Sequence, residues 1–220
     1  MKTIYLVRHG KAVSRYENVK DFDRDLVGRG RNDALIVAGH MAENGAVPSI
    51  IVSSPARRTL ETARQFARRF GYPTKKIRTR KAIYDQNAGA FMEIIKGLDD
   101  SHGSAMLVGH NPVIENIAFT LSPSCTEVMS TGSVYGIALE VNSWCDIKPG
   151  AGDLTMFLSP KALKAQHKTP YKKVEVKNKL IEGIELILSG MDENTTKRMT
   201  KPIRKTSAAL ADTFIRILKK

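Results

Sequence analysis

The sequence predicts an α/β protein: a three-layer α/β/α sandwich around a mostly parallel sheet, followed by a basic helical extension. Over residues 1–160, short apolar segments of strand length alternate with longer segments whose apolar residues have helical spacing. Residues 1–160 hold 20 Lys/Arg against 16 Asp/Glu, whereas residues 161–220 hold 15 against 6, so the net charges are +4 and +9. We therefore expect a domain over 1–160 and a separate extension over 161–220.

The elements of the first half follow one another in order. The apolar run 3–7 predicts the opening strand, and apolar residues at helical spacing predict a helix over 31–41. The β-branched run 49–53 predicts a second strand. Ser54 and Pro55 then predict the start of a long helix, because serine caps helices and proline suits a first turn.

The second half continues the alternation of strands and helices. The same patterns predict, in chain order, a strand over 77–83, a helix over 91–98, a strand over 105–108, a helix that begins near Pro112, a strand over 134–141 and an edge strand over 154–158. Because strands joined through helices run parallel, this order favours a parallel sheet with helices on both faces.

The extension has a different composition. Residues 161–177 are basic with few large apolar side chains, which predicts a linker, and two helices are expected over 180–188 and 203–218. Its excess positive charge fits an acidic partner, such as nucleic acid, polyphosphate or an acidic protein face. A solvated lysine-rich surface, or packing of the apolar stripes on the domain, fits equally well. The oligomeric state is left open.

The cysteines and the hydropathy of the chain indicate in which compartment of the cell the protein is expected. Cys125 and Cys145 form no CxxC pair and lie in no His/Cys cluster, so we expect no metal site and two reduced thiols, with a single disulfide between them as the alternative. No apolar stretch approaches the ~20 residues that cross a bilayer, and the first residues lead into a strand rather than a signal peptide. We expect a cytoplasmic protein that does not use a membrane.

Polar residues follow three of the expected strands: Arg8-His9-Gly10, residues 53–58 and Gly109-His110. Open α/β sheets bind ligands at the carboxyl ends of their strands. Arginine binds phosphate oxygens with a planar fork, a helix N-terminus attracts anions, and neutral histidine can carry a phosphoryl group. One of Arg57 and Arg58 can reach such an anion. Taken alone, His110 also fits a helix cap.

In combination, four segments resemble the histidine phosphatase superfamily, the phosphoglycerate mutase-like proteins. They are Leu6–Gly10, Asp25–Gly30, Val52–Ala63 and Val108–Pro112, and their order and spacing agree over about residues 1–160. The resemblance implies a metal-independent phosphatase without a cofactor. His9 would be the nucleophile that becomes phosphohistidine, and Arg8, Arg58 and His110 would bind the phosphoryl oxygens. Asp85, or His110 itself, would protonate the leaving group.

Two positions depart from the family pattern. Val27 stands where threonine is common, so one polar contact near the site is expected to be missing. Asp85 stands where larger members carry a glutamate, and it is one carbon shorter. A neighbouring arginine favours a charged carboxylate, whereas an acid catalyst must carry a proton. A loop or cap carboxylate is therefore an equal interpretation of Asp85.

The motifs are joined without long insertions. This compact plan resembles the SixA-type branch of protein phosphohistidine phosphatases, whose substrate is a phosphorylated protein side chain. Two alternatives stay open. The chain could hydrolyse a small phosphomonoester, such as a sugar phosphate or nucleotide, or it could be a phosphate-binding module that uses the basic extension to hold a polyanion or a protein partner.

Overall fold

The computed structural model describes residues 1–167 apart from Arg15 and Glu17, together with five isolated residues beyond them. These five are Glu182, Thr206, Ser207, Leu210 and Thr213. The chain divides into two compact units, 1–163 and 164–220. Apart from these five residues, the helices expected over 180–188 and 203–218 lie outside the described part of the chain, so they stay predictions.

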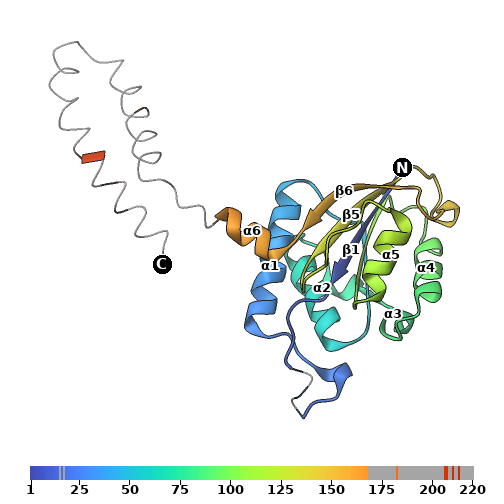
Figure 1. The fold of residues 1–220 in the computed structure, drawn as a ribbon, viewed down its shortest axis with the longest axis horizontal. Coiled ribbons are helices and arrows are strands. Elements are labelled where there is room, and N and C mark those ends of the chain that lie inside the picture. Colours follow the sequence, from blue (N-terminus) through green and yellow to red (C-terminus); the bar gives the residue numbers. More distant parts are fainter. Residues whose placement is uncertain are drawn as a thin grey trace. The chain divides into compact units, whose positions relative to one another are not determined.

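The strands of the first unit form one six-stranded sheet in the order β3-β2-β4-β1-β5-β6 (Figure 1). Their bounds are β1 Lys2–Arg8, β2 Ile50–Ser53, β3 Arg78–Thr79, β4 Ser104–Gly109, β5 Val134–Leu139 and β6 Gly152–Leu158. β1, β2, β3 and β4 pair in parallel, β5 runs antiparallel to β1, and β6 runs antiparallel to β5 at the edge. The expected mostly parallel sheet is confirmed.

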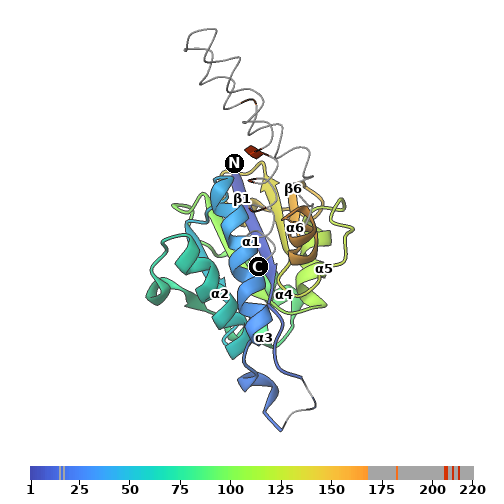
Figure 2. The same cartoon turned by 90° about the vertical axis from the view of Figure 1, so that its left-hand side faces the viewer.

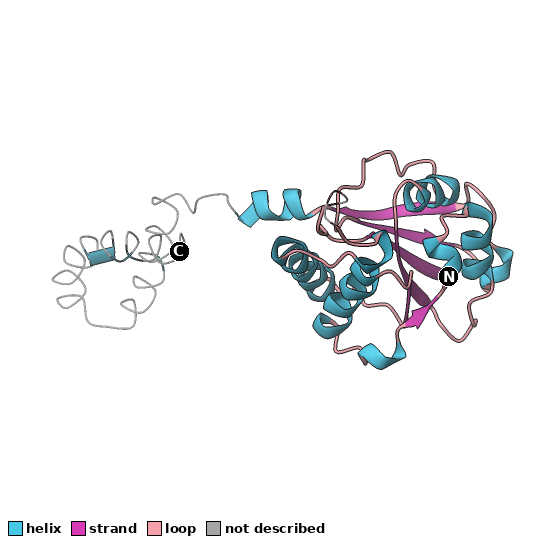
Figure 3. Ribbon diagram, turned by 90° about the horizontal axis from the view of Figure 1, so that it is seen from below, coloured by secondary structure: helices cyan, strands magenta, loops and turns pink. Residues whose placement is uncertain are grey.

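Helices cover both faces of this sheet (Figures 2 and 3). Their bounds are α1 Gly28–Glu43, α2 Arg57–Arg69, α3 Lys81–Tyr84, α4 Ala88–Lys96, α5 Val113–Leu121 and α6 Pro160–His167. Side chains of β1 alternate between two cores, as the period of a strand requires. Ile4 and Leu6 pack with α4 and α5, whereas Tyr5 and Val7 pack with α1 and α2.

Two boundaries differ from the sequence-based expectation. The strand expected over 77–83 is wrong beyond two residues, because Arg78 and Thr79 pair with the last residues of the short β2 and α3 follows. Ile83 is then buried from a helical turn. The helix expected from Ser54 begins at Arg57 instead. Ser54 serves the preceding turn, where its hydroxyl accepts the Ala56 N–H at 3.3 Å.

The expected linker also begins later than the sequence suggested. Residues 161–167 belong to α6, and Leu163 is 3% exposed in the same core as the side chains of α1 and α2. The side chain of Leu163 alone anchors a helical turn of this basic segment on the core. The average composition of residues 161–177 does not reveal a contact made by one residue. The remaining residues of the expected linker lie outside the described part of the chain.

Candidate active site

His9 follows directly on β1, at the centre of the sheet. Its backbone N–H donates to Gly109 O of the neighbouring β4 at 3.1 Å, and the preceding Arg8 N–H donates to Ser133 O at 3.0 Å. The Gly10 N–H donates to Thr62 Oγ1 on α2 at 3.0 Å. The chain is therefore held from both sides just where the histidine leaves the sheet.

The His9 ring is set up as a neutral imidazole whose Nε2 has no hydrogen-bond partner among the residues that the structure describes. Nδ1 lies 2.8 Å from Gly10 O, which can only accept, so Nδ1 carries the proton. Burial lowers the pKa of His9 to about 4, and the charges of Arg58, Arg8 and Arg24 act in the same direction against the opposing Gly10 hydrogen bond. At neutral pH the Nε2 lone pair is thus available for nucleophilic attack.

Two arginines lie beside this ring, of which Arg58 is buried and Arg8 is partly buried. Arg58, in the first turn of α2, is 3% exposed, and its Nη2 donates to His110 Nδ1 at 3.3 Å. Arg8 donates from Nη1 to Met129 O, while its Nε is buried and has no hydrogen-bond partner within the described part of the chain. Arg57, by contrast, has a half-exposed side chain and pairs with Asp25 at 3.0 Å. Arg58 is therefore the arginine of this pair that faces the site.

His110 follows β4 and completes the group. It is 4% exposed, and its ring centroid lies 5.3 Å from that of His9. A guanidinium group can only donate, so Nδ1 of His110 accepts from Arg58 and the proton lies on Nε2, which donates to Ser54 Oγ at 2.9 Å. The four residues expected from three strand ends, Arg8, His9, Arg58 and His110, thus lie together.

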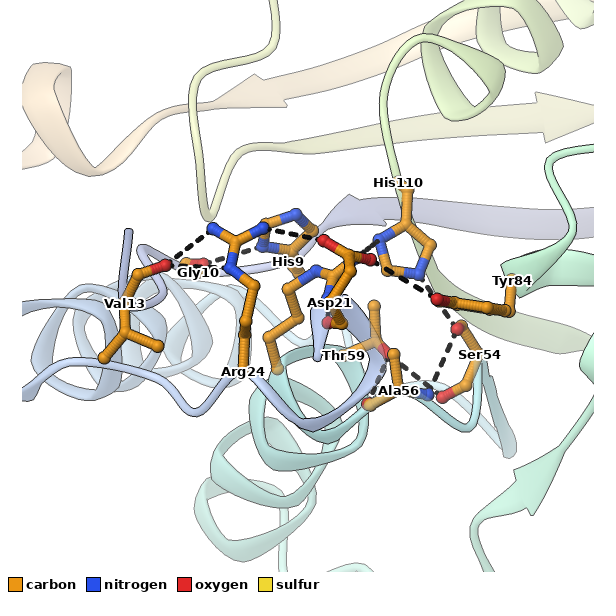
Figure 4. A network of polar contacts seen from close by, with 11 residues as sticks. His9, Gly10, Val13, Asp21, Arg24, Ser54, Ala56, Thr59, Tyr84 and His110 are labelled. Atoms are coloured by element: carbon orange, nitrogen blue, oxygen red, sulfur yellow. Dashed lines mark hydrogen bonds and ion pairs between the residues drawn. The ribbon is translucent and has the colours of Figure 1, made fainter. Parts of the chain in front are cut away.

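The structure adds two residues from the loop after β1 that the sequence did not single out. Asp21 Oδ2 lies 2.8 Å from Arg58 Nη2, and Asp21 Oδ1 lies 2.9 Å from Arg24 Nη1 (Figure 4). Burial alone would raise the pKa of Asp21, but the hydrogen bonds from Arg24 and Arg58 outweigh it and lower the pKa to about 2. Arg24 is itself 9% exposed and brings a third guanidinium group near His9.

An aromatic pair lies beside His110. The Tyr84 ring is 5.8 Å from the His110 ring and meets Phe22 edge-on at 5.2 Å, and its hydroxyl reaches Asp21 Oδ2 at 3.4 Å. Both aromatic residues belong to short irregular segments, the 3₁₀ turn Asp21–Asp23 and α3. No periodicity marks such segments in a sequence, so no signal there could have found them.

The two departures from the family pattern behave differently. Asp85 ends α3 as an exposed residue, and both of its carboxylate oxygens lie 2.8 Å from Lys81 Nζ. The structure does not bring it into contact with His9, Arg58 or His110. Val27 is the residue before α1 and makes no side-chain cap.

Other chemistries find little support among the described residues. Within that part of the chain no group of three or more His, Cys, Asp or Glu side chains could hold a metal ion. Cys125 is buried, Cys145 is exposed, and both are free thiols. None of the described helices is long and apolar enough to cross a membrane.

A neutral histidine surrounded by buried guanidinium groups, at the carboxyl ends of parallel strands, defines an enzyme that acts on phosphate groups. The comparison with known families agrees. The chain belongs to the histidine phosphatase superfamily (branch 1), whose family model matches residues 4–117.

Solved structures with the same fold include two SixA proteins. The putative phosphohistidine phosphatase SixA from Agrobacterium tumefaciens is 25% identical, with a TM-score of 0.61 over 72% of this chain and 98% of that one. The protein histidine phosphatase SixA complexed with tungstate has a TM-score of 0.63 at 17% identity, over 73% of this chain and 99% of that one. An uncharacterized protein of Mycobacterium tuberculosis is 26% identical in an alignment of 165 residues that covers 70% of this chain and 100% of the relative.

Proposed function

We propose that the chain removes the phosphoryl group from protein phosphohistidine through a phosphohistidine intermediate at His9. Nε2 of His9 attacks phosphorus, the P–N bond of the substrate breaks, and the electron pair of that bond stays on the leaving imidazole. Arg8 and Arg58 hold the non-bridging oxygens and stabilise their charge in the transition state, and His110 joins them when its Nε2–H exchanges Ser54 Oγ for a phosphoryl oxygen. Water then attacks the phosphorus, which releases inorganic phosphate and restores neutral His9.

The observation that carries this proposal is the hydrogen bond from His9 Nδ1 to Gly10 O. It places the proton on the nitrogen that does not react, and the low pKa of about 4 keeps Nε2 unprotonated at neutral pH. The buried Arg8 Nε without a partner, in the described part of the chain, supports an anion at this place. Metal ions have no part in these steps.

The substrate class is argued from proton supply. The carboxylate of Asp21 has a pKa of about 2 and is bound by two arginines, so it holds no proton to give. The carboxylate of Asp85 accepts hydrogen bonds from Lys81 Nζ. Neutral His110 donates its Nε2 proton to Ser54 Oγ. A phosphate ester requires an acid for its alkoxide, whereas a phosphorylated imidazole protonated on its other nitrogen leaves as a neutral ring. The likeness to the Agrobacterium SixA supports the same substrate.

A substrate panel tests both parts of the proposal. It contains a phosphohistidine peptide, phosphoramidate, a sugar phosphate, a nucleotide and polyphosphate, each assayed in EDTA with wild type, His9→Ala and Asp85→Asn. We expect the highest kcat/KM on the phosphohistidine peptide, loss of all turnover in His9→Ala and little change in Asp85→Asn. Retained turnover in His9→Ala would refute the mechanism.

The panel also separates the alternatives. A sugar phosphate or nucleotide that is hydrolysed best would replace phosphohistidine as the substrate class. A strong loss in Asp85→Asn would make that carboxylate the proton donor, as the family resemblance implies. Binding of polyphosphate without hydrolysis of any substrate would favour the phosphate-binding module.

A further inference from the structure

A pocket of about 300 Å³, separate from the residues around His9, lies against one face of α2. Asp25 and Arg31 line it together with residues of α2 from Arg57 to Arg68 that recur every three or four positions and so share one face of the helix. Arg58, one residue further along the helix than Arg57, is buried toward His110 and does not line this pocket. The two sites thus use different faces of one helix.

The pocket is rich in arginine, and two of its cations are already paired. Arg31 Nε lies 2.5 Å from Glu61 Oε1, and Arg57 Nε lies 3.0 Å from Asp25 Oδ1. Arg64 and Arg68, one helical turn apart, line the same pocket, are exposed and form no ion pair with any residue that the structure describes. Four guanidinium groups against two carboxylates leave a formal excess of two positive charges.

The pocket is also tied to the loop that carries Arg24 to the active site. Asp25, which pairs with Arg57, is the next residue after Arg24. The following residue, Leu26, donates its backbone N–H to Glu61 Oε2 at 3.2 Å. A partner bound in this pocket would therefore lie beside the chain segment that leads into the site of His9.

We propose that this pocket binds an acidic segment of the phosphoprotein substrate, with two Asp or Glu side chains about one helical turn apart that pair with Arg64 and Arg68. Guanidinium groups bind carboxylates through two parallel hydrogen bonds, and the spacing of the free cations matches carboxylates at positions i and i+4. The inference deepens the proposed function and rests on it for the identity of the bound protein.

A nucleic acid fits the same pocket less well. Single-stranded nucleic acid binds where aromatic side chains stack its bases, and none of the described side chains that line the pocket is aromatic. Asp25 and Glu61 would also repel a continuous phosphodiester backbone, whereas discrete carboxylates can be placed between them.

The direct test measures binding by fluorescence anisotropy with the full chain at moderate salt. The probe is a labelled helical peptide with Glu at i and i+4 and no phosphate, compared with the same peptide carrying Gln. Arg64→Gln/Arg68→Gln removes the two free cations, and Lys75→Gln/Lys76→Gln removes the same charge from exposed lysines outside the pocket. The basic extension is present in all three proteins, so its contribution cancels.

We expect the arginine variant to bind the Glu peptide roughly tenfold more weakly than wild type, and the lysine variant to differ from wild type by less than about twofold. Equal binding by the arginine variant and wild type, or an equal loss in the lysine variant, overturns the proposal. An oligonucleotide that binds more tightly than the Glu peptide and depends on Arg64 and Arg68 overturns it in favour of nucleic acid.

A kinetic arm links the pocket to catalysis. With phosphohistidine peptides that differ only in an acidic or neutral flank, the arginine variant is expected to raise KM for the acidic peptide alone, with kcat and the turnover of phosphoramidate unchanged. Equal KM values for both flanks in wild type contradict the inference. If no protein hydrolyses either peptide, the proposed function fails, while the anisotropy result still decides the pocket.

Discussion

The carboxylate of Asp21 bridges Arg58 and Arg24, at 2.8 Å and 2.9 Å, and Arg58 is the same guanidinium group that contacts His110. An internal anion thus engages two of the cations that surround His9. A phosphoryl group that binds beside His9 has to compete with this carboxylate for their hydrogen bonds, or to share them.

We expect Asp21→Asn to bind orthovanadate, an analogue of the transferring phosphoryl group, about three- to tenfold more tightly than wild type, because the competing charge is removed while one hydrogen bond is kept. Inhibition constants measure this. Asp23→Asn, in the same 3₁₀ turn but without an ion pair to these arginines, is the control. Weaker binding in Asp21→Asn would show that the carboxylate positions the arginines rather than competes with the ligand.

His9 is expected to titrate near pH 4 in the folded protein, well below the 6.5 of an ordinary histidine. The folded state then binds fewer protons than the unfolded state between these values, so stability is complete above about pH 6.5 and falls as the pH drops toward 4. This linkage is worth up to roughly 3 kcal/mol. Nitrogen NMR of labelled histidine, assigned by its absence in His9→Asn, measures the titration and the Nδ1 tautomer.

The stability difference between wild type and His9→Asn checks the same linkage independently. In urea unfolding, wild type should lose stability relative to the variant as the pH falls from 6.5 to 4, and the difference should be constant below 4. A histidine signal that titrates near 6.5, or parallel stability curves, would contradict a buried neutral nucleophile.

Adjacent arginines of α2 provide a matched pair for the phosphate pocket. Arg58→Lys should reduce kcat/KM by about 10²- to 10³-fold, because a buried planar donor beside His110 is replaced by a point charge. Arg57→Lys, at a half-exposed position paired with Asp25, should change kcat/KM by less than about threefold. Steady-state kinetics with unchanged circular dichroism decides this, and equal effects would mean that Arg58 has no special role.

Two glycines in the first turn of α1 should respond differently when they are replaced by alanine. A Cβ on Gly30 would lie 2.1 Å from the backbone oxygen of Lys11, which follows the His9 segment, whereas a Cβ on Gly28 meets nothing within 4 Å. We expect Gly30→Ala to lower the free energy of unfolding by about 3 kcal/mol and Gly28→Ala to leave it unchanged or slightly raised. Urea denaturation measures both, and similar values would contradict the close approach.

Much of the fold followed from local patterns. Apolar runs marked β1, β2, β4, β5 and the edge strand β6, because buried strands are apolar wherever they pair. The pattern failed over 77–83, where only Arg78 and Thr79 pair with β2 and the chain then turns into α3. It failed again at α6, where a single leucine docks on the core. In both places the structure of the segment depends on the part of the protein against which it packs, and not on the segment's own sequence pattern.

The sequence by itself determined the chemistry of the centre of the site. Arg8, His9, Arg58 and His110 stand at strand ends and in a helix's first turn, and parallel strands bring their carboxyl ends together whatever the loops do. Only the tertiary structure decided what surrounds them. Asp21 meets Arg58 across 37 positions of the chain, and Asp85 turns to Lys81 instead. Irregular loops take their conformation from such distant contacts, and no local periodicity records those contacts in the sequence.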